Sequence, residues 1–140
     1  MSTHFTEFLS AAEFMFLCGT QIDLRNAISR AYYSMYHAAR LVGERYPDPN
    51  HGIGMGEHER LCKRFIHAKG DRKAVAVGYV LQSAKTARRR ADYDLGASVT
   101  HEEACDVMED ARSFASKLAL CSLYDDEDGV VAPTPGSTLS

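Results

Sequence analysis

The sequence of 140 residues lacks long apolar runs, a basic leader and the alternating pattern of a half-buried strand. No run approaches the roughly 18 apolar residues of a membrane-spanning helix, so we expect no membrane partner. The opening residues MSTH have no basic segment typical of a signal peptide, which favours a cytoplasmic protein. Since strand-like alternation is missing and apolar residues recur every three to four positions, the pattern predicts an all-α fold.

Paired cysteines are also missing. Cys18, Cys62, Cys105 and Cys121 lie far apart in the sequence, and no two of them form a CxxC pair. A structural zinc site or a redox dithiol is therefore not expected. Three of the four lie among apolar residues of expected helices, which predicts reduced and mostly buried thiols.

Several signatures of catalytic and nucleotide-binding sites are absent as well. The histidines lack the HExxH spacing of zinc proteases, and no GxSxG serine motif is present. The glycine-rich residues 52–56 neither follow an expected strand nor precede a Lys-Ser or Lys-Thr pair, which excludes a phosphate-binding loop of the common kind. We expect no metal ion and no cofactor.

What is present is a series of five periodic segments separated by short breaks. We expect helices over about residues 6–18, 20–45, 57–68, 71–93 and 100–124. Thr20 with Asp23, and Thr100 with Glu103, have the spacing of helix-opening capping boxes, and Asp71 suits the N-cap of the fourth segment. Short connections between such helices predict an up-and-down five-helix bundle over residues 1–124. Residues 125–140, acidic and then rich in Pro, Gly, Ser and Thr, are expected to form a disordered acidic tail.

Charge is distributed unevenly along the chain. Residues 60–90 hold ten basic side chains and one acidic one, whereas residues 91–140 hold two basic and eleven acidic ones. The basic segment can attract phosphate backbones, with Lys85, Arg89 and Arg90 as the expected RNA contacts. The alternative is that it pairs with the acidic third of its own or another chain.

Residues 29–40 (SRAYYSMYHAAR) carry the first candidate site. Arg30 and His37 are two helical turns apart, about 10 Å along the axis, with Tyr33 between them on nearly the same face. A histidine can transfer a proton at the ribose 2′-OH or at the leaving oxygen, and an arginine can stabilise the charged phosphorane. This pair suits metal-free RNA cleavage. The alternative is that both side chains hold helices together through acidic partners.

Residues 88–94 (RRRADYD) carry the second candidate site. Arg88 falls on the apolar side of its expected helix and needs a partner, such as Asp92 or a residue of the second helix. Arg89 and Arg90 are freer to meet phosphates. We therefore expect Arg30, Tyr33 and His37 to share one groove with Arg88, Asp92 or Tyr93, although a purely structural Arg–Asp–Tyr network is the alternative.

The motifs RAYY (30–33) with HAA (37–39), followed by ADY (91–93) after arginines, resemble the HEPN superfamily. The chain is most similar to the branch of small stand-alone prokaryotic proteins with RAYYxxxHA-like and RxxADY-like helices. The opening of the last helix, residues 100–104 (THEEA), fits the same branch. The resemblance covers about residues 5–121.

This resemblance implies a helical bundle that dimerises. Many HEPN proteins are metal-independent endoribonucleases of toxin–antitoxin, CRISPR or antiphage systems, with an Arg-x4-6-His motif assembled from two protomers. Arg30 and His37 match Arg-x6-His, whereas in many members the motif lies on a late helix, where this chain has Arg88 to Tyr93 and no histidine. Some members pair with a small nucleotidyltransferase that neutralises them, in some cases by adenylylating a tyrosine beside the motif.

Two functions of different class follow from the resemblance. One is an RNA-binding protein that acts as a metal-independent endoribonuclease and works as a homodimer or with a nucleotidyltransferase partner. The other is a non-catalytic HEPN module that binds a nucleotide, an RNA or a partner protein.

Overall fold

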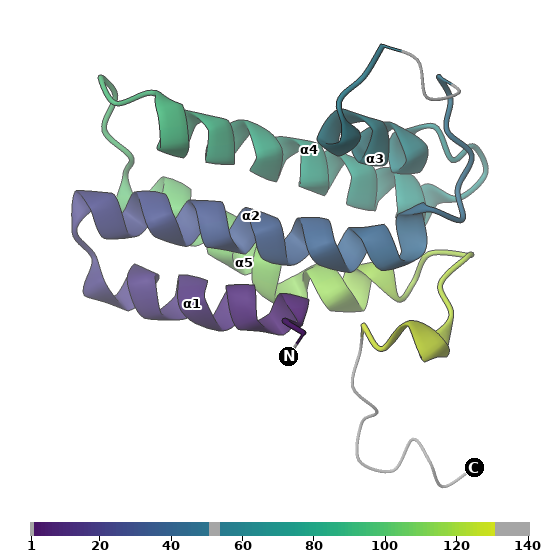
Figure 1. Cartoon of the computed structure of the whole chain (residues 1–140), viewed down its shortest axis with the longest axis horizontal. Helices are drawn as coiled ribbons and strands as arrows, with labels where there is room; N and C mark the ends of the chain where they lie inside the picture. The colour runs from purple at the N-terminus through teal and green to yellow at the C-terminus, as the bar shows by residue number, and fades with distance from the viewer. Residues whose placement is uncertain (1, 51–53, 131–140) are drawn as a thin grey trace, which may run out of the picture.

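The computed structural model describes residues 2–50 and 54–130, and within these ranges it contains five α-helices and no strand (Figure 1). They are α1 (Phe5–Cys18), α2 (Gln21–Gly43), α3 (Glu57–Ile66), α4 (Arg72–Tyr93) and α5 (His101–Leu118). The prediction of an all-α fold with five helices is confirmed.

The long helix α2 lies at the centre of the bundle. Figure 1 shows α1 along one side of it, α4 along the other and α5 behind, with consecutive long helices running in opposite directions. The short α3 packs against α4 and α2. The expected apolar stripe of α2 is buried along its whole length: Leu24, Ile28, Ala31, Met35, Ala38 and Val42. Apart from this stripe, α2 therefore has one remaining face open between α1 and α4.

Local capping explains where most helices begin. The capping boxes of Thr20 with Asp23 and of Thr100 with Glu103 are both formed, and the Asp71 side chain accepts a hydrogen bond from the Ala74 amide at 3.1 Å. These three expectations are confirmed. The box that opens α1, in which His4 is the N-cap residue and Glu7 the third helical residue, was not anticipated from the sequence.

A glycine sets how closely α3 approaches α4. A Cβ atom at Gly78 would lie 2.8 Å from the backbone nitrogen of Ile66 and 2.9 Å from Cβ of Phe65. The missing side chain therefore lets the two helices pack at short range, which fixes α3, and the residues at its start, against the rest of the bundle.

The C-terminal expectations need correction. The last helix ends at Leu118, not near residue 124, because the Ser122 amide donates to Asp71 at 2.9 Å and the Leu123 amide to the Tyr46 hydroxyl at 3.3 Å. The tail is not disordered over residues 125–130. It forms a 3-10 helix (Asp126–Asp128), and Asp128 pairs with Arg45 of the α2–α3 connection at 2.5 Å.

Val130, which follows that short helix, is only 5% exposed and belongs to the core. The bundle therefore extends past the boundary at residue 124 that was expected from the sequence, because a single apolar side chain and one ion pair hold the acidic segment in place. Residues 131–140, also expected to be disordered, lie outside the described residues.

All four cysteines are free, but they are not mostly buried. Cys62 and Cys121 are buried, and burial raises the pKa of each thiol to about 11. Cys105 is half-buried and Cys18 is exposed at the end of α1, so the sequence-based expectation is wrong for these two. Among the described helices, none is long and apolar enough to cross a membrane.

Candidate functional site

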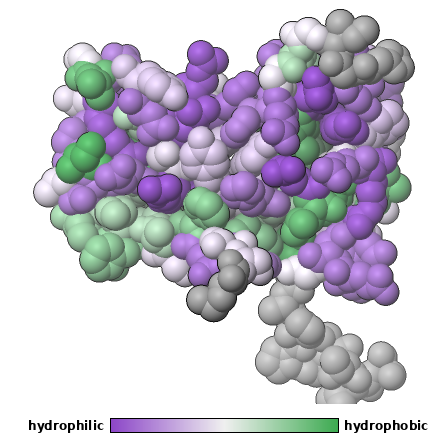
Figure 2. Space-filling view, in the orientation of Figure 1, coloured by the Kyte–Doolittle hydropathy of each residue, from purple (hydrophilic) through white to green (hydrophobic). Residues whose placement is uncertain are grey.

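The open face of α2 carries the residues expected from the RAYYxxxHAA motif. Tyr33 and His37 are half-buried on this face, and Arg30 is exposed. Figure 2 shows that the corresponding side of the molecule is largely hydrophilic over α2 and α4, while α1 presents apolar side chains. The polar stripe of α2 therefore reaches the surface between its two neighbouring helices.

Five aromatic and imidazole rings lie against one another along this side of α2, and we call them the ring cluster: the buried Tyr32 and Tyr36 and the half-buried Tyr33, His37 and His58. The ring of Tyr33 lies 6.2 Å from that of His37 and 6.1 Å from that of His58. The centroid of Tyr36 is 5.2 Å from His37 and 4.0 Å from His58, nearly parallel to the latter. Four members come from α2, whereas His58 comes from the first turn of α3.

Arg88 of α4 packs against two tyrosine rings of the cluster. Its guanidinium carbon lies 5.5 Å from the ring centroid of Tyr32 and 5.9 Å from those of Tyr33 and Tyr93. Its side chain is 11% exposed and pairs with Asp92 at 3.7 Å. Asp92 in turn accepts a hydrogen bond from Ser29 at 3.3 Å, which links α4 back to α2. Within the described residues, Nε of Arg88 has no hydrogen-bond partner, so the guanidinium retains one unused donor.

The structure therefore brings together most of the residues expected to share a groove. Tyr33 and His37 of α2 lie with Arg88 of α4, and Asp92 and Tyr93 adjoin that arginine. Arg30 is the exception. It points to solvent, and in the part of the chain that the structure describes it makes no ring, ion-pair or hydrogen-bond contact with the cluster.

Sequence reasoning named Tyr33 and His37 as site residues but not Tyr32, Tyr36 or His58, and of these three His58 comes from a different helix. Its Nδ1 lies 2.5 Å from the hydroxyl of the fully buried Tyr32. A signal was present in the sequence, because His58 precedes Leu61, Cys62 and Phe65 on the buried stripe of α3. A polar residue on an otherwise apolar stripe requires a partner, and only the packing of α3 on α2 identifies that partner as Tyr32.

Burial is the largest cause that lowers the pKa of both histidines of the cluster. The pKa of His37 is lowered by burial and then by the charge of Arg40. The pKa of His58 is lowered by burial and then by Arg88 and Lys85, while Glu57 opposes the change. Burial also raises the pKa of Tyr32, so its hydroxyl stays protonated. Both imidazoles are therefore available as proton acceptors at neutral pH.

Two surface cavities adjoin the cluster on the side of Arg40. One of about 380 Å³ is lined by His37 and Arg40 together with His4 and Glu44, and a smaller one of about 180 Å³ by Tyr36, Arg40 and Arg60. Arg40 lines both cavities, and its guanidinium carbon lies 5.7 Å from the ring centroid of Tyr36. A phosphate group in either cavity would meet a guanidinium, and a base beside it would meet a ring.

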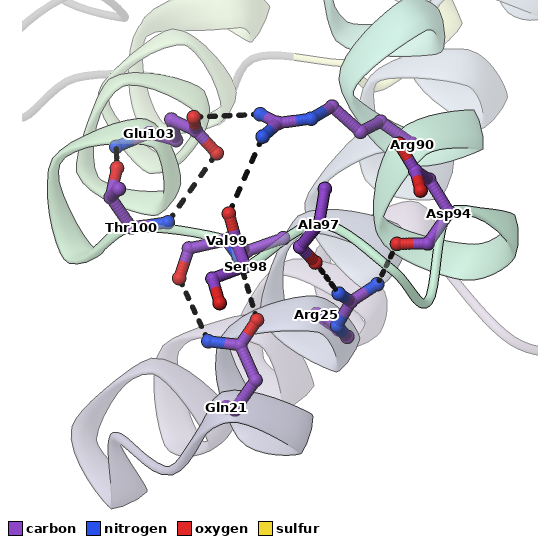
Figure 3. A network of polar contacts seen from close by, with 9 residues as sticks. All are labelled: Gln21, Arg25, Arg90, Asp94, Ala97, Ser98, Val99, Thr100 and Glu103. Carbon is purple, nitrogen blue, oxygen red and sulfur yellow. Dashed lines mark hydrogen bonds and ion pairs between the residues drawn. The ribbon is translucent and has the colours of Figure 1, made fainter.

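The three expected RNA-contacting residues of α4 differ in their surroundings. Arg89 is exposed and Lys85 is half-buried beside His58. Arg90, expected to be freer than Arg88 to meet phosphates, pairs with Glu103 at 2.6 Å and donates to the Ser98 carbonyl at 3.3 Å (Figure 3). Glu103 lies in the first turn of α5, close to the end of α4, and its carboxylate partly neutralises the charge of Arg90.

The end of α4 that carries Arg88 to Tyr93 is fixed to α2 by Arg25. The Arg25 side chain is 7% exposed and donates to the carbonyls of Ala91 at 2.8 Å, Asp94 at 3.1 Å and Ala97. Figure 3 shows the guanidinium inserted beneath the α4–α5 loop, with the Gln21 side chain paired to the backbone of Val99 beside it. These bonds satisfy carbonyls that the last turn of a helix leaves open, and they set the position of Arg88 relative to the ring cluster.

Comparison of the chain with family models, curated proteins and solved structures found no match. Within residues 2–50 and 54–130, no group of three or more His, Cys, Asp or Glu side chains is arranged to hold a metal ion. The chemistry available at the ring cluster is therefore that of imidazole, guanidinium, phenol and carboxylate groups.

Proposed function

We propose that this protein is a HEPN-type helical bundle that binds single-stranded RNA on the ring cluster and cleaves it without a metal ion. One observation carries the proposal: His37 and Tyr33 are half-buried side by side on the polar face of α2, flanked by Arg40 on one side and by the Tyr33–Arg88 contact on the other. Tyrosine and histidine rings stack on unpaired bases, and arginines contact phosphates. His37 is the proton-transfer group, and Arg30, from the motif resemblance, stabilises the charged phosphorane.

A second candidate, a non-catalytic module that binds RNA, a nucleotide or a partner protein, is favoured by a different observation. His37 is held by ring contacts alone, and none of the described residues forms a hydrogen bond with it. A catalytic imidazole is usually oriented by such a bond, although catalytic hydrogen bonds often form only when the substrate is bound.

Incubation of the purified protein with total RNA in EDTA distinguishes the two candidates. The first requires RNA fragments that end in 2′,3′-cyclic phosphates, since no metal ion takes part. A shift of intact RNA in a native gel, without fragments, supports the second. RNA that is neither bound nor cut contradicts the RNA-directed form of both.

Neutralising a basic residue of α4 should weaken RNA binding in a salt-dependent manner. Arg89→Ala and Lys85→Ala each remove one cation, and each should reduce the slope of log K against log salt by about 0.7 for a single strand. Arg90→Ala should have a smaller effect, because Glu103 already pairs with that side chain. Arg112→Ala, which removes the same charge from α5, is the matched control and should leave the slope unchanged. Fluorescence anisotropy of labelled RNA at several salt concentrations measures this slope.

We further propose, as the resemblance implies, that the protein works as a homodimer or with a nucleotidyltransferase-type partner in a toxin–antitoxin or antiphage system. Exposed apolar side chains support an additional contact: Phe14 is 65% and Leu17 is 82% exposed on α1. Ile22 and Leu95, also exposed, line a depression where the α1–α2 and α4–α5 connections meet. A monomer gains nothing from such exposure, whereas a second subunit would bury it.

Light scattering at tens of micromolar should therefore give the mass of a dimer. Leu17→Glu should shift the protein to a monomer, because it introduces a charge into an apolar contact. Thr86→Glu, which adds the same charge to the exposed face of α4, should not. A monomeric mass for the unchanged protein, both alone and with a candidate partner, would contradict this prediction.

A further inference from the structure

The ring cluster contains two imidazoles from different helices, and both contact one tyrosine. His58 stacks on Tyr36 at 4.0 Å with an angle of 9° between the rings, and His37 meets the same ring at 5.2 Å and 69°. The two side chains thus lie within one short stretch of surface. Cleavage of RNA by its own 2′-OH needs one group to accept a proton and a second to donate one, so a site with two imidazoles can supply both.

The hydrogen bond between Tyr32 and His58 allows His58 to gain and lose a proton in turn. A phenolic hydroxyl can donate to a neutral imidazole nitrogen and can accept from a protonated one. The 2.5 Å contact between the Tyr32 hydroxyl and Nδ1 can therefore persist in both states. Since the Tyr32 hydroxyl occupies Nδ1, the nitrogen of His58 that would meet a substrate is Nε2, on the other side of the ring.

Burial and nearby cations lower the pKa of both histidines, but the two rings differ in their acidic neighbours. Arg40 faces His37 and disfavours its protonated form. His58 also has cations nearby, Arg88 and Lys85, but the carboxylate of Glu57 opposes them. Glu57 in turn pairs with Arg40 at 3.5 Å. Glu57 lies beside His58 and opposes the lowering of its pKa, whereas the charged group that acts on the pKa of His37 is Arg40. By this difference in neighbours, and not by the direction of its pKa, His58 is the better placed of the two rings to carry a proton.

We propose that His58 is the general acid that complements His37 as general base, an inference that rests on the proposed ribonuclease function. His37 takes the proton of the ribose 2′-OH while that oxygen forms a bond to phosphorus. The bond from phosphorus to the 5′ oxygen breaks, and His58 gives its proton to that oxygen. The products are a 2′,3′-cyclic phosphate and a 5′-hydroxyl, and water restores the proton of His58 and removes that of His37.

A substrate that needs no general acid tests this assignment directly. In an RNA whose 5′ bridging oxygen at the cleavage site is replaced by sulfur, the thiolate leaves without protonation. His58→Ala and His58→Gln should each slow cleavage of the ordinary oligonucleotide by roughly 10²- to 10⁴-fold but cleave the sulfur-containing one at close to the unchanged rate. His37→Ala should be slow on both. His67→Ala, which removes an exposed histidine at the other end of α3, is the control.

The pH profile supplies a second readout that a structural role would not move. For the unchanged protein, kcat/KM should fall at low pH as His37 is protonated and at high pH as His58 loses its proton. His58→Gln should abolish the high-pH limb alone. Tyr32→Phe, which removes the positioning hydroxyl, should shift that limb without removing it.

Four possible results decide whether His58 is the general acid. Rescue of the His58 variants by the sulfur-containing substrate, together with loss of the high-pH limb, supports the proposal. Equal impairment on both substrates would overturn it, because His58 would then act in folding or binding, and unchanged cleavage of ordinary RNA would overturn it as well. Absence of cleavage by the unchanged protein would instead overturn the ribonuclease function on which the assignment rests.

Discussion

Replacing His37 with alanine should lower the rate of RNA cleavage by roughly 10²- to 10⁴-fold, because the 2′-OH would lose its proton acceptor. His37 is half-buried, and its ring contacts in α1 and α2 include Phe8 at 5.0 Å, so the fold should survive its loss. Cleavage by the unchanged protein should persist in EDTA. A fixed-time RNA gel and a thermal melting curve measured on the same preparation separate loss of activity from loss of structure.

Arg30→Ala should cause a loss of similar size through the missing charge on the phosphorane. Since Arg30 is exposed and contacts no member of the ring cluster, its substitution should not change the melting temperature. Arg40→Ala is the informative comparison, because Arg40 shares a cavity with His37. If Arg40→Ala abolishes cleavage and Arg30→Ala does not, the phosphate-stabilising role belongs to Arg40. Variants of His37 and Arg30 that melt earlier but still cleave RNA would contradict the catalytic assignment.

Arg25→Met should destabilise the bundle by about 3 kcal/mol, the second large effect that we expect. The substitution keeps an apolar stem but removes a buried cation that donates to three backbone carbonyls. One bond from a charged donor contributes about 1.5–3 kcal/mol, and we take the upper end because the three bonds share one guanidinium and do not add independently. For a chain of this length, the melting temperature should fall by roughly 10 °C. Circular dichroism during thermal unfolding measures the change.

Arg112→Met is the matched control for Arg25. Arg112 pairs with Glu13 at 2.6 Å on the surface, and exposed pairs of this kind contribute about 1 kcal/mol or less. The melting temperature of Arg112→Met should stay close to that of the unchanged protein. If the melting temperature of Arg25→Met were equally close, the α4–α5 loop would hold its position without Arg25. The same variant should also weaken RNA binding, since Arg88 is placed by that loop.

The sequence by itself determined the helices, because the features that specify them are local. The apolar stripes of α2 and α5 repeat every three to four residues, and the capping residues at Thr20, Asp71 and Thr100 lie within one turn of the helices that they open. The chemistry of the site was visible in the same way. Tyr33 and His37 share a helix face by spacing alone, and the placement of Arg88 on the apolar side of α4 already required a partner nearby.

Tertiary structure alone decided which side chains meet across helices. His58 reaches Tyr32 over 26 positions and Arg25 reaches Ala97 over 72, and no local pattern specifies contacts at such separations. The same holds for the end of the chain, where one ion pair with Arg45 and the burial of Val130 order a segment whose composition is typical of disorder. Composition describes the average tendency of a segment, whereas its order depends on whether the folded bundle offers a site in which even one residue can be buried.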